Sequence, residues 1–221
     1  MSKNVIRRTR LALLSAGALL LAGCNIGVPV MYAITGPPKI PALYEIDGSR
    51  PTVILIDDPR SRVPRRELRL LIGQTADETL LKAKAIENGK LIGSRSALSA
   101  ATSSAASQTL SIVDVGRRVG AEVVIYAEVT DWRFALGPEG VAPSVALSVS
   151  IFDTLANQRL WPEEGGQVMV TSLPAEAGFK SGDRPVLERA LAKEAGLRLG
   201  QMFFEHAKDQ LQNRRVDKLG G

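Results

Sequence analysis

The chain has 221 residues, of which 45% are hydrophobic, 5% aromatic and 23% charged, so it can bury the core of a full domain and wholesale disorder is excluded. Its formal charge of +5 arises at the amino terminus, because four of the 28 basic residues lie in the first ten positions and the first 23 residues contain no acid. Without those 23 residues the balance is 24 basic against 23 acidic residues, which excludes a global electrostatic attraction to nucleic acid.

The first 23 residues have the organisation of a secretory signal. Four basic residues precede Leu11 to Ala22, an uncharged run of twelve residues that is too short for a membrane-spanning helix, which needs about 20. The run closes with Leu21-Ala22-Gly23-Cys24, which resembles the lipobox of bacterial lipoproteins. The resemblance implies cleavage before Cys24 and a covalent lipid on its sulfur, and several acyl chains on one protein give stable anchoring.

The lipidated cysteine also limits the chemistry and the location that we expect. Cys24 is the only cysteine in the chain, so no disulfide can form within it, and we expect no cofactor other than the lipid. Residue Asn25 stands where an aspartate would favour retention in the inner membrane in the enterobacterial sorting pattern. We therefore expect anchoring to the outer membrane, facing the periplasm.

Composition divides the mature chain into three parts. Residues 25–51 contain five prolines and three glycines, which disfavour helices and central strands, so 24–51 is interpreted as a tether whose apolar residues pack in part on the domain. A single α/β domain is predicted over 52–211. A disordered tail is predicted over 212–221.

The first half of the predicted domain alternates strands and helices. Residues 52–57 form a continuous apolar run with β-branched residues, which is typical of a buried strand. A helical pattern opens at Pro64 and ends at Asn88-Gly89, and Thr75-Ala76-Asp77-Glu78 reads as a capping box that would start a second helix within it. Leu91-Ile92 is a candidate short strand. The segment 94–108, with six serines and five alanines, is predicted to be a mobile loop with at most one helical turn.

The second half reads as one helix, a meander and a final helix. A 3.6-residue period over 109–119 predicts a helix that stops at Gly120. Strands are predicted at 122–134, 145–153, 159–161 and 167–172. Asp183 is expected to cap a helix from Arg184 to about Leu211. The expected fold is α/β, with a mixed sheet of about five strands, helices packed on it, and the order β-α-β-α-β-β-β-α.

Two segments carry a resemblance to a known fold group. They are Gly120-Ala121-Glu122 with the following strand to Val129, and Val149 to Trp161, which contains Asp153-Thr154-Leu155-Ala156-Asn157. They resemble the small α/β domain shared by the amino-terminal domain of TolB, the lipoprotein activators of penicillin-binding proteins and the lipoprotein of the curli secretion channel. In that pattern Glu122 stands for an aspartate and Asn157 for a turn glycine, and asparagine tolerates positive φ.

The usual catalytic constellations are missing from the sequence. His206 is the only histidine and is expected to be solvent-exposed in the last helix, so neither a histidine-based triad nor a zinc site is predicted, and we expect no enzyme activity. Asp57 and Asp58 lie at the carboxyl end of the first strand, where α/β sites often lie, but neighbouring strand residues point to opposite faces. Trp132 and Trp161 are expected to pack on the core.

An arginine cluster is the candidate binding site. Five arginines fall within ten positions, namely Arg60, Arg62, Arg65, Arg66 and Arg69. Such a run is usually a solvated face. Positive charge at a helix amino terminus nevertheless opposes the helix macrodipole, so an external anion is a candidate partner: a lipid headgroup, a cell-wall polymer or an acidic protein face.

The expected function is non-enzymatic. The resemblance to the penicillin-binding-protein activators implies a lipid-anchored periplasmic module that binds a protein partner in envelope assembly or maintenance. A subunit of an oligomeric outer-membrane secretion channel is the first alternative, but it needs membrane hairpins with alternating apolar faces, and neither the serine-alanine segment nor 173–182 alternates. A carboxylate-dependent hydrolase is the second alternative.

Overall fold

The computed structural model describes residues 38–102, 110–137, 140–174 and 183–208, and the chain divides into two compact units. In the unit formed by residues 1–40 and 206–221, strand β1 (Lys39–Ile40) pairs antiparallel with β8 (His206–Ala207). The N–H of Lys208 also donates to the carbonyl of Pro38 at 2.8 Å. All other described elements belong to the second unit, residues 41–205.

The larger unit is built on one mixed sheet, as the sequence predicts, with six strands instead of about five. The strands are β2 (Thr52–Asp57), β3 (Leu91–Ile92), β4 (Val123–Gly137), β5 (Gly140–Asp153), β6 (Gln158–Trp161) and β7 (Gln167–Ser172). Their order is β3-β2-β4-β5, and β6 and β7 both pair with β5 on its far side. Strand β2 is parallel to β3 and β4, and the remaining pairs are antiparallel.

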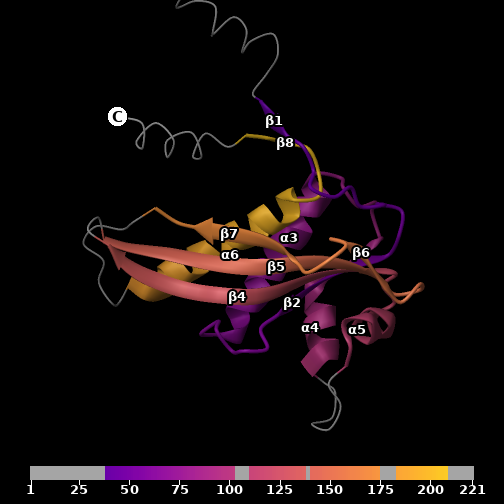
Figure 1. The fold of residues 1–221 in the computed structure, drawn as a ribbon, viewed down its shortest axis with the longest axis horizontal. Coiled ribbons are helices and arrows are strands. Elements are labelled where there is room, and N and C mark those ends of the chain that lie inside the picture. Colours follow the sequence, from indigo (N-terminus) through magenta and orange to yellow (C-terminus); the bar gives the residue numbers. More distant parts are fainter. Residues whose placement is uncertain (1–37, 103–109, 138–139, 175–182, 209–221) are drawn as a thin grey trace, which may run out of the picture. The chain divides into compact units, whose positions relative to one another are not determined.

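Helices cover both faces of the sheet (Figure 1). The long helices α3 (Arg66–Lys82) and α6 (Arg184–Gln201) pack on one face, and the short helices α4 (Ser94–Thr102) and α5 (Ile112–Val119) pack on the other. Strand β2 is apolar on both faces because Ile54 and Ile56 meet the first pair of helices while Val53 and Leu55 meet the second. In β5 the buried residues alternate, and they face α3 and α6.

The serine-alanine segment is partly a helix, so the prediction of a loop over 94–108 was wrong for 94–102; residues 103–108 lie outside the described part. Ala97 and Ala100 of α4 are buried in one cluster with Val53 and Leu55 of β2 and Val115 of α5. Small side chains let the helix approach the sheet closely, and this packing outweighs the low apolar content that suggested a loop.

The predicted second helix start at Thr75-Ala76-Asp77-Glu78 was also wrong, because α3 runs through it without a break. Asp77 is instead buried and accepts a hydrogen bond from the N–H of Ser94 at 2.8 Å, at the first residue of α4. Burial raises the pKa of Asp77, because desolvation penalises its charged form. The residue therefore joins α3 to α4.

Three predicted helix ends differ from the structure. Helix α3 ends at Lys82 instead of near Gly89, α5 begins at Ile112 after the N-cap Ser111, and α6 ends at Gln201 instead of near Leu211. Asp183 occupies the N-cap position of α6 but makes no side-chain capping bond. The last helix does not reach His206, which lies half-buried in β8 opposite Ile40.

Candidate functional site

The two aspartates at the carboxyl end of β2, Asp57 and Asp58, accept hydrogen bonds that hold the chain after the strand. The carboxylate of Asp58, which is 7% exposed, accepts hydrogen bonds from the N–H groups of Arg62 and Val63 at 2.8 and 2.9 Å. Asp57 accepts a bond from the hydroxyl of Tyr126 at 2.9 Å. Burial raises the pKa of Tyr126, and the charge of Asp57 adds to this. These contacts fix the loop that carries the arginine cluster.

Two of the five predicted arginines stabilise the fold. Arg62 donates a hydrogen bond to the backbone carbonyl of Thr130 on β4. Arg65 forms an ion pair of 2.6 Å with Glu188 of α6, whose side chain is 6% exposed and also binds Arg184 at 3.0 Å. Removal of Arg65 would leave the buried carboxylate of Glu188 with Arg184 as its one remaining ion-pair partner among the described residues, which is destabilising. Arg62 and Arg65 are therefore structural.

The other three arginines, Arg60, Arg66 and Arg69, make no ion pair with any described acid. Arg60 is exposed in the loop, and Arg69 is half-buried one turn along α3 from Arg66. Arg66 is exposed and donates a hydrogen bond to the hydroxyl of Thr102 at 3.0 Å, at the end of α4. The structure thus splits the predicted cluster into structural and available arginines.

A fourth available arginine comes from α4. Arg95 and Arg66 line a hollow of about 160 Å³ between α3 and α4, which we call the basic hollow. Its other lining residues are Glu67, Leu70, Leu98 and Ser99. Neither arginine forms an ion pair with Glu67. The interpretation of 94–108 as a loop missed Arg95, although the spacing of Ser94, Ala97, Leu98 and Ala101 is the i, i+3, i+4, i+7 pattern of a helix.

A larger groove between α3 and α6 has a volume of about 700 Å³ but no excess of either charge. Its lining includes Glu78 with Lys82, which are 3.8 Å apart in an ion pair, and Glu194, which pairs with Arg198 at 2.8 Å. Local pairs of this kind compensate one another and leave little field for an external ion. The groove is therefore a weaker candidate for a charged partner than the basic hollow.

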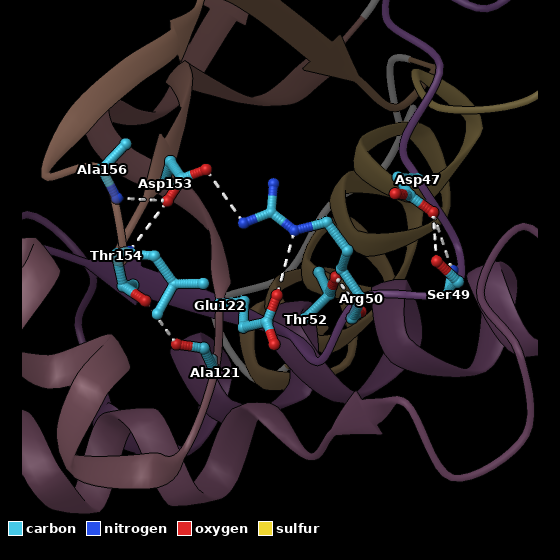
Figure 2. A network of polar contacts seen from close by, with 10 residues as sticks. Asp47, Ser49, Arg50, Thr52, Ala121, Glu122, Asp153, Thr154 and Ala156 are labelled. Atoms are coloured by element: carbon cyan, nitrogen blue, oxygen red, sulfur yellow. Dashed lines mark hydrogen bonds and ion pairs between the residues drawn. The ribbon is translucent and has the colours of Figure 1, made fainter.

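The residues that carry the sequence resemblance form a polar network (Figure 2). The guanidinium of Arg50 binds Glu122 at 3.1 Å and Asp153 at 2.9 Å, so it joins the start of β4 to the end of β5. Asp153 also accepts the N–H groups of Leu155 and Ala156 at 2.8 and 2.7 Å. The bond from Ala156 lowers the pKa of Asp153 and outweighs its desolvation, and Arg50 lowers it further. Arg50, Glu122 and Asp153 are thus paired with opposite charges within the network, which is typical of a structural role.

Two backbone conformations next to this network confirm sequence predictions. Gly120 ends α5 in the left-handed region with φ of 79°, and the N–H of Ala121 bonds to the carbonyl of Gly116. Asn157 takes φ of 53° in the turn between β5 and β6, where the related pattern has a glycine. Both positions serve the fold.

The remaining candidate residues are the two tryptophans and Cys24. Trp132 and Trp161 pack partly buried against the core, as predicted, and the ring of Trp161 lies 6.0 Å from that of Tyr44. Cys24 lies outside the described residues. Within residues 38–102, 110–137, 140–174 and 183–208, no group of three His, Cys, Asp or Glu side chains could hold a metal ion. Within the same ranges, no helix has the length and apolar character needed to span a membrane.

Comparison with known proteins gives structural neighbours only. No family model matches the chain, and no curated protein matches it. Protein CT253 from Chlamydia trachomatis is 13% identical, with 70% of this chain and 98% of that chain covered and a TM-score of 0.42. PelC from Paraburkholderia phytofirmans, solved as a dodecamer, is 10% identical, with 76% and 97% covered and a TM-score of 0.41. Lipoprotein GNA1162 from Neisseria meningitidis is 12% identical, with 76% and 96% covered and a TM-score of 0.41. Similarity at this level assigns neither function nor assembly to this chain.

Proposed function

We propose that the chain is a non-enzymatic lipoprotein, anchored through Cys24 to the outer membrane and facing the periplasm, whose domain binds an acidic protein partner in envelope assembly or maintenance. The observation that carries the binding role is the basic hollow, which Arg66 and Arg95 both line and in which neither forms an ion pair with a described acid. The signal segment and the Leu21-Ala22-Gly23-Cys24 sequence support the anchor.

The dimensions of the basic hollow suit a side chain of a partner better than a small-molecule substrate. Its 160 Å³ is below the roughly 300 to 1,000 Å³ of ligand pockets. The two guanidinium groups, in a hollow that Leu70 and Leu98 also line, would bind a carboxylate by charge and by paired hydrogen bonds. Arg60 and Arg69 extend the positive charge along the loop and α3, so the favoured partner is an acidic protein face.

Charge reversal in the basic hollow tests this proposal. The intact lipoprotein would be used to capture its partner from a membrane fraction, and affinity would then be measured for an Arg66→Glu/Arg95→Glu variant. We expect a loss of affinity of about tenfold or more at low salt, and a smaller difference at high salt, because exposed charges are screened.

The matched control is Arg118→Glu/Arg189→Glu, which makes the same charge change at two exposed arginines that line neither cavity. It should bind like the wild type. If the wild type and the Arg66→Glu/Arg95→Glu variant bind the partner with equal affinity, the two arginines are part of an ordinary solvated face and do not bind the partner. Equal losses in both variants would show that net charge, not the basic hollow, attracts the partner.

A further inference from the structure

Strand β7 leaves one edge of the sheet open. Among the described residues β7 pairs with β5 and with no other strand, and the order of the sheet places it beyond β5 on the side away from β4 (Figure 1). Helix α6 packs on one face of β7, where Met169 contacts the main core. The outer edge of the strand therefore presents backbone groups without a neighbouring strand.

The register shows which backbone groups these are. The N–H of Leu173 bonds to the carbonyl of Pro143 at 3.0 Å, so their antiparallel pair is a hydrogen-bonded one. Such pairs alternate, so Met169 opposite Leu147 is also hydrogen-bonded to β5, whereas Val168 and Val170 turn their N–H and C=O groups away from it. The carbonyl of Val168 is approached only by the side chain of its neighbour Gln167, at 3.4 Å.

The side chains at this edge are apolar and exposed. Val168 is 60% exposed and Val170 is 68% exposed, and both lie on the face opposite Met169. The sequence Gln-Val-Met-Val-Thr-Ser of β7 contains no charged residue and no proline, and its register against β5 has no bulge. Charges, prolines and bulges are among the features by which sheet edges avoid pairing, and within residues 167–172 this edge has none of them.

We propose that β7 pairs antiparallel with β7 of a second copy of this chain, about a two-fold axis at Met169. This register is the one in which Val168 meets Val170 of the second copy, so the outward backbone groups of each copy bond to those of the other. The valines of both copies then form one apolar cluster on a single face. Two neutral strands place no like charges opposite one another, and the same patch serves both copies, as a closed dimer requires.

Cysteine cross-linking tests the register in the full chain in detergent. At the two-fold axis the two Met169 residues form a non-hydrogen-bonded pair with Cα atoms about 4.5 Å apart, within the range of a disulfide. We expect Met169→Cys to give disulfide dimers at least about tenfold faster than Val168→Cys, Val170→Cys or Leu155→Cys. Leu155, 70% exposed in the turn after β5, is the control away from the edge, and the wild type gives the background rate.

Sedimentation of matched lysine variants tests the pairing without cross-links. Val170→Lys should make the protein monomeric, because each copy would lose a valine contact and place a charge in the apolar cluster. Val186→Lys should keep the concentration-dependent dimer of the wild type, because Val186 is equally exposed, at 68%, but lies on α6. A wild-type protein that stays monomeric at all concentrations would overturn the proposal. Binding of an extended peptide from another protein to β7 would not rescue it. Equal cross-linking rates at 169 and 155 would overturn it as well.

Discussion

Helix α3 packs so closely on α6 that one methyl group added at Gly196 should destabilise the protein. A Cβ added at Gly196 would lie 2.4 Å from the backbone carbonyl of Ile72 and 2.7 Å from Cβ of Thr75. A backbone oxygen cannot rotate away as a flexible side chain can, so Gly196→Ala must push the two helices apart by about half an ångström or more. This separation would loosen the contact of α3 with β2 and of α6 with β5.

The magnitude follows from two opposing effects. Overpacking of a tight core costs typically 1 to 3 kcal/mol, whereas alanine is favoured over glycine within a helix by about 1 kcal/mol. Because the nearest atom at Gly196 is a backbone oxygen, the overpacking cost falls in the upper part of this range, at about 2 to 3 kcal/mol. We therefore expect Gly196→Ala to lower the free energy of unfolding by about 1 to 2 kcal/mol. Gly93→Ala is the control, because a Cβ there meets no atom within 4 Å. Urea unfolding of both variants gives the measurement, and a Gly196→Ala variant as stable as the wild type would refute the close packing of α3 on α6.

Three further predictions concern the core, the buried carboxylate and the anchor. Ile125→Ala should cost about 2 to 5 kcal/mol in the free energy of unfolding, since the side chain is fully buried, whereas the exposed Ser96→Ala should cost almost nothing; similar losses would contradict the strand assignment. Because the pKa of Asp77 is raised, the native state binds its proton at higher pH than the unfolded chain. Its stabilising contribution is present at low pH and is lost as pH rises through the native pKa. Wild-type stability relative to Asp77→Asn should therefore rise as pH falls from neutral towards 4, and a constant difference in urea unfolding would contradict this. Cys24→Ser should leave an uncleaved precursor or an unlipidated protein, and mass spectrometry that finds a free thiol at Cys24 of the mature wild type would contradict the anchor.

The sequence predicts elements well where an apolar pattern is set by the sheet. Residues 52–57 and 167–172 match β2 and β7 to the residue, because turn residues bound both runs. It fails where packing depends on small side chains or on contacts distant in the chain. Helix α4 is held by Ala97 and by the bond between Asp77 and Ser94, which lie 17 positions apart, and a local pattern cannot show either contact.

The same reason explains the outcome at the arginine cluster. Composition identifies the five arginines but not their partners, and Glu188, which neutralises Arg65, lies 123 positions away on α6. Arg95 was missed because its helix was missed. The charge available for a partner is therefore set by tertiary contacts, which use Arg62 and Arg65 in the fold and leave Arg66 with Arg95 on the surface.

The basic hollow and the β7 edge are separated along the strand order of the sheet, and this separation leads to a last prediction. Helices α3 and α4 meet beside β2, while β7 lies beyond β5, so three strand spacings, about 15 Å in total, separate β2 from β7. This exceeds the distance of about 8 Å over which physiological salt screens exposed charges. Sedimentation of the Arg66→Glu/Arg95→Glu variant should therefore give the same dimer dissociation constant as that of the wild type. The Val170→Lys variant should keep the basic hollow intact. A dimer weakened by charge reversal in the basic hollow would show that the two surfaces form one interface, and the two-fold pairing through Met169 would then be wrong.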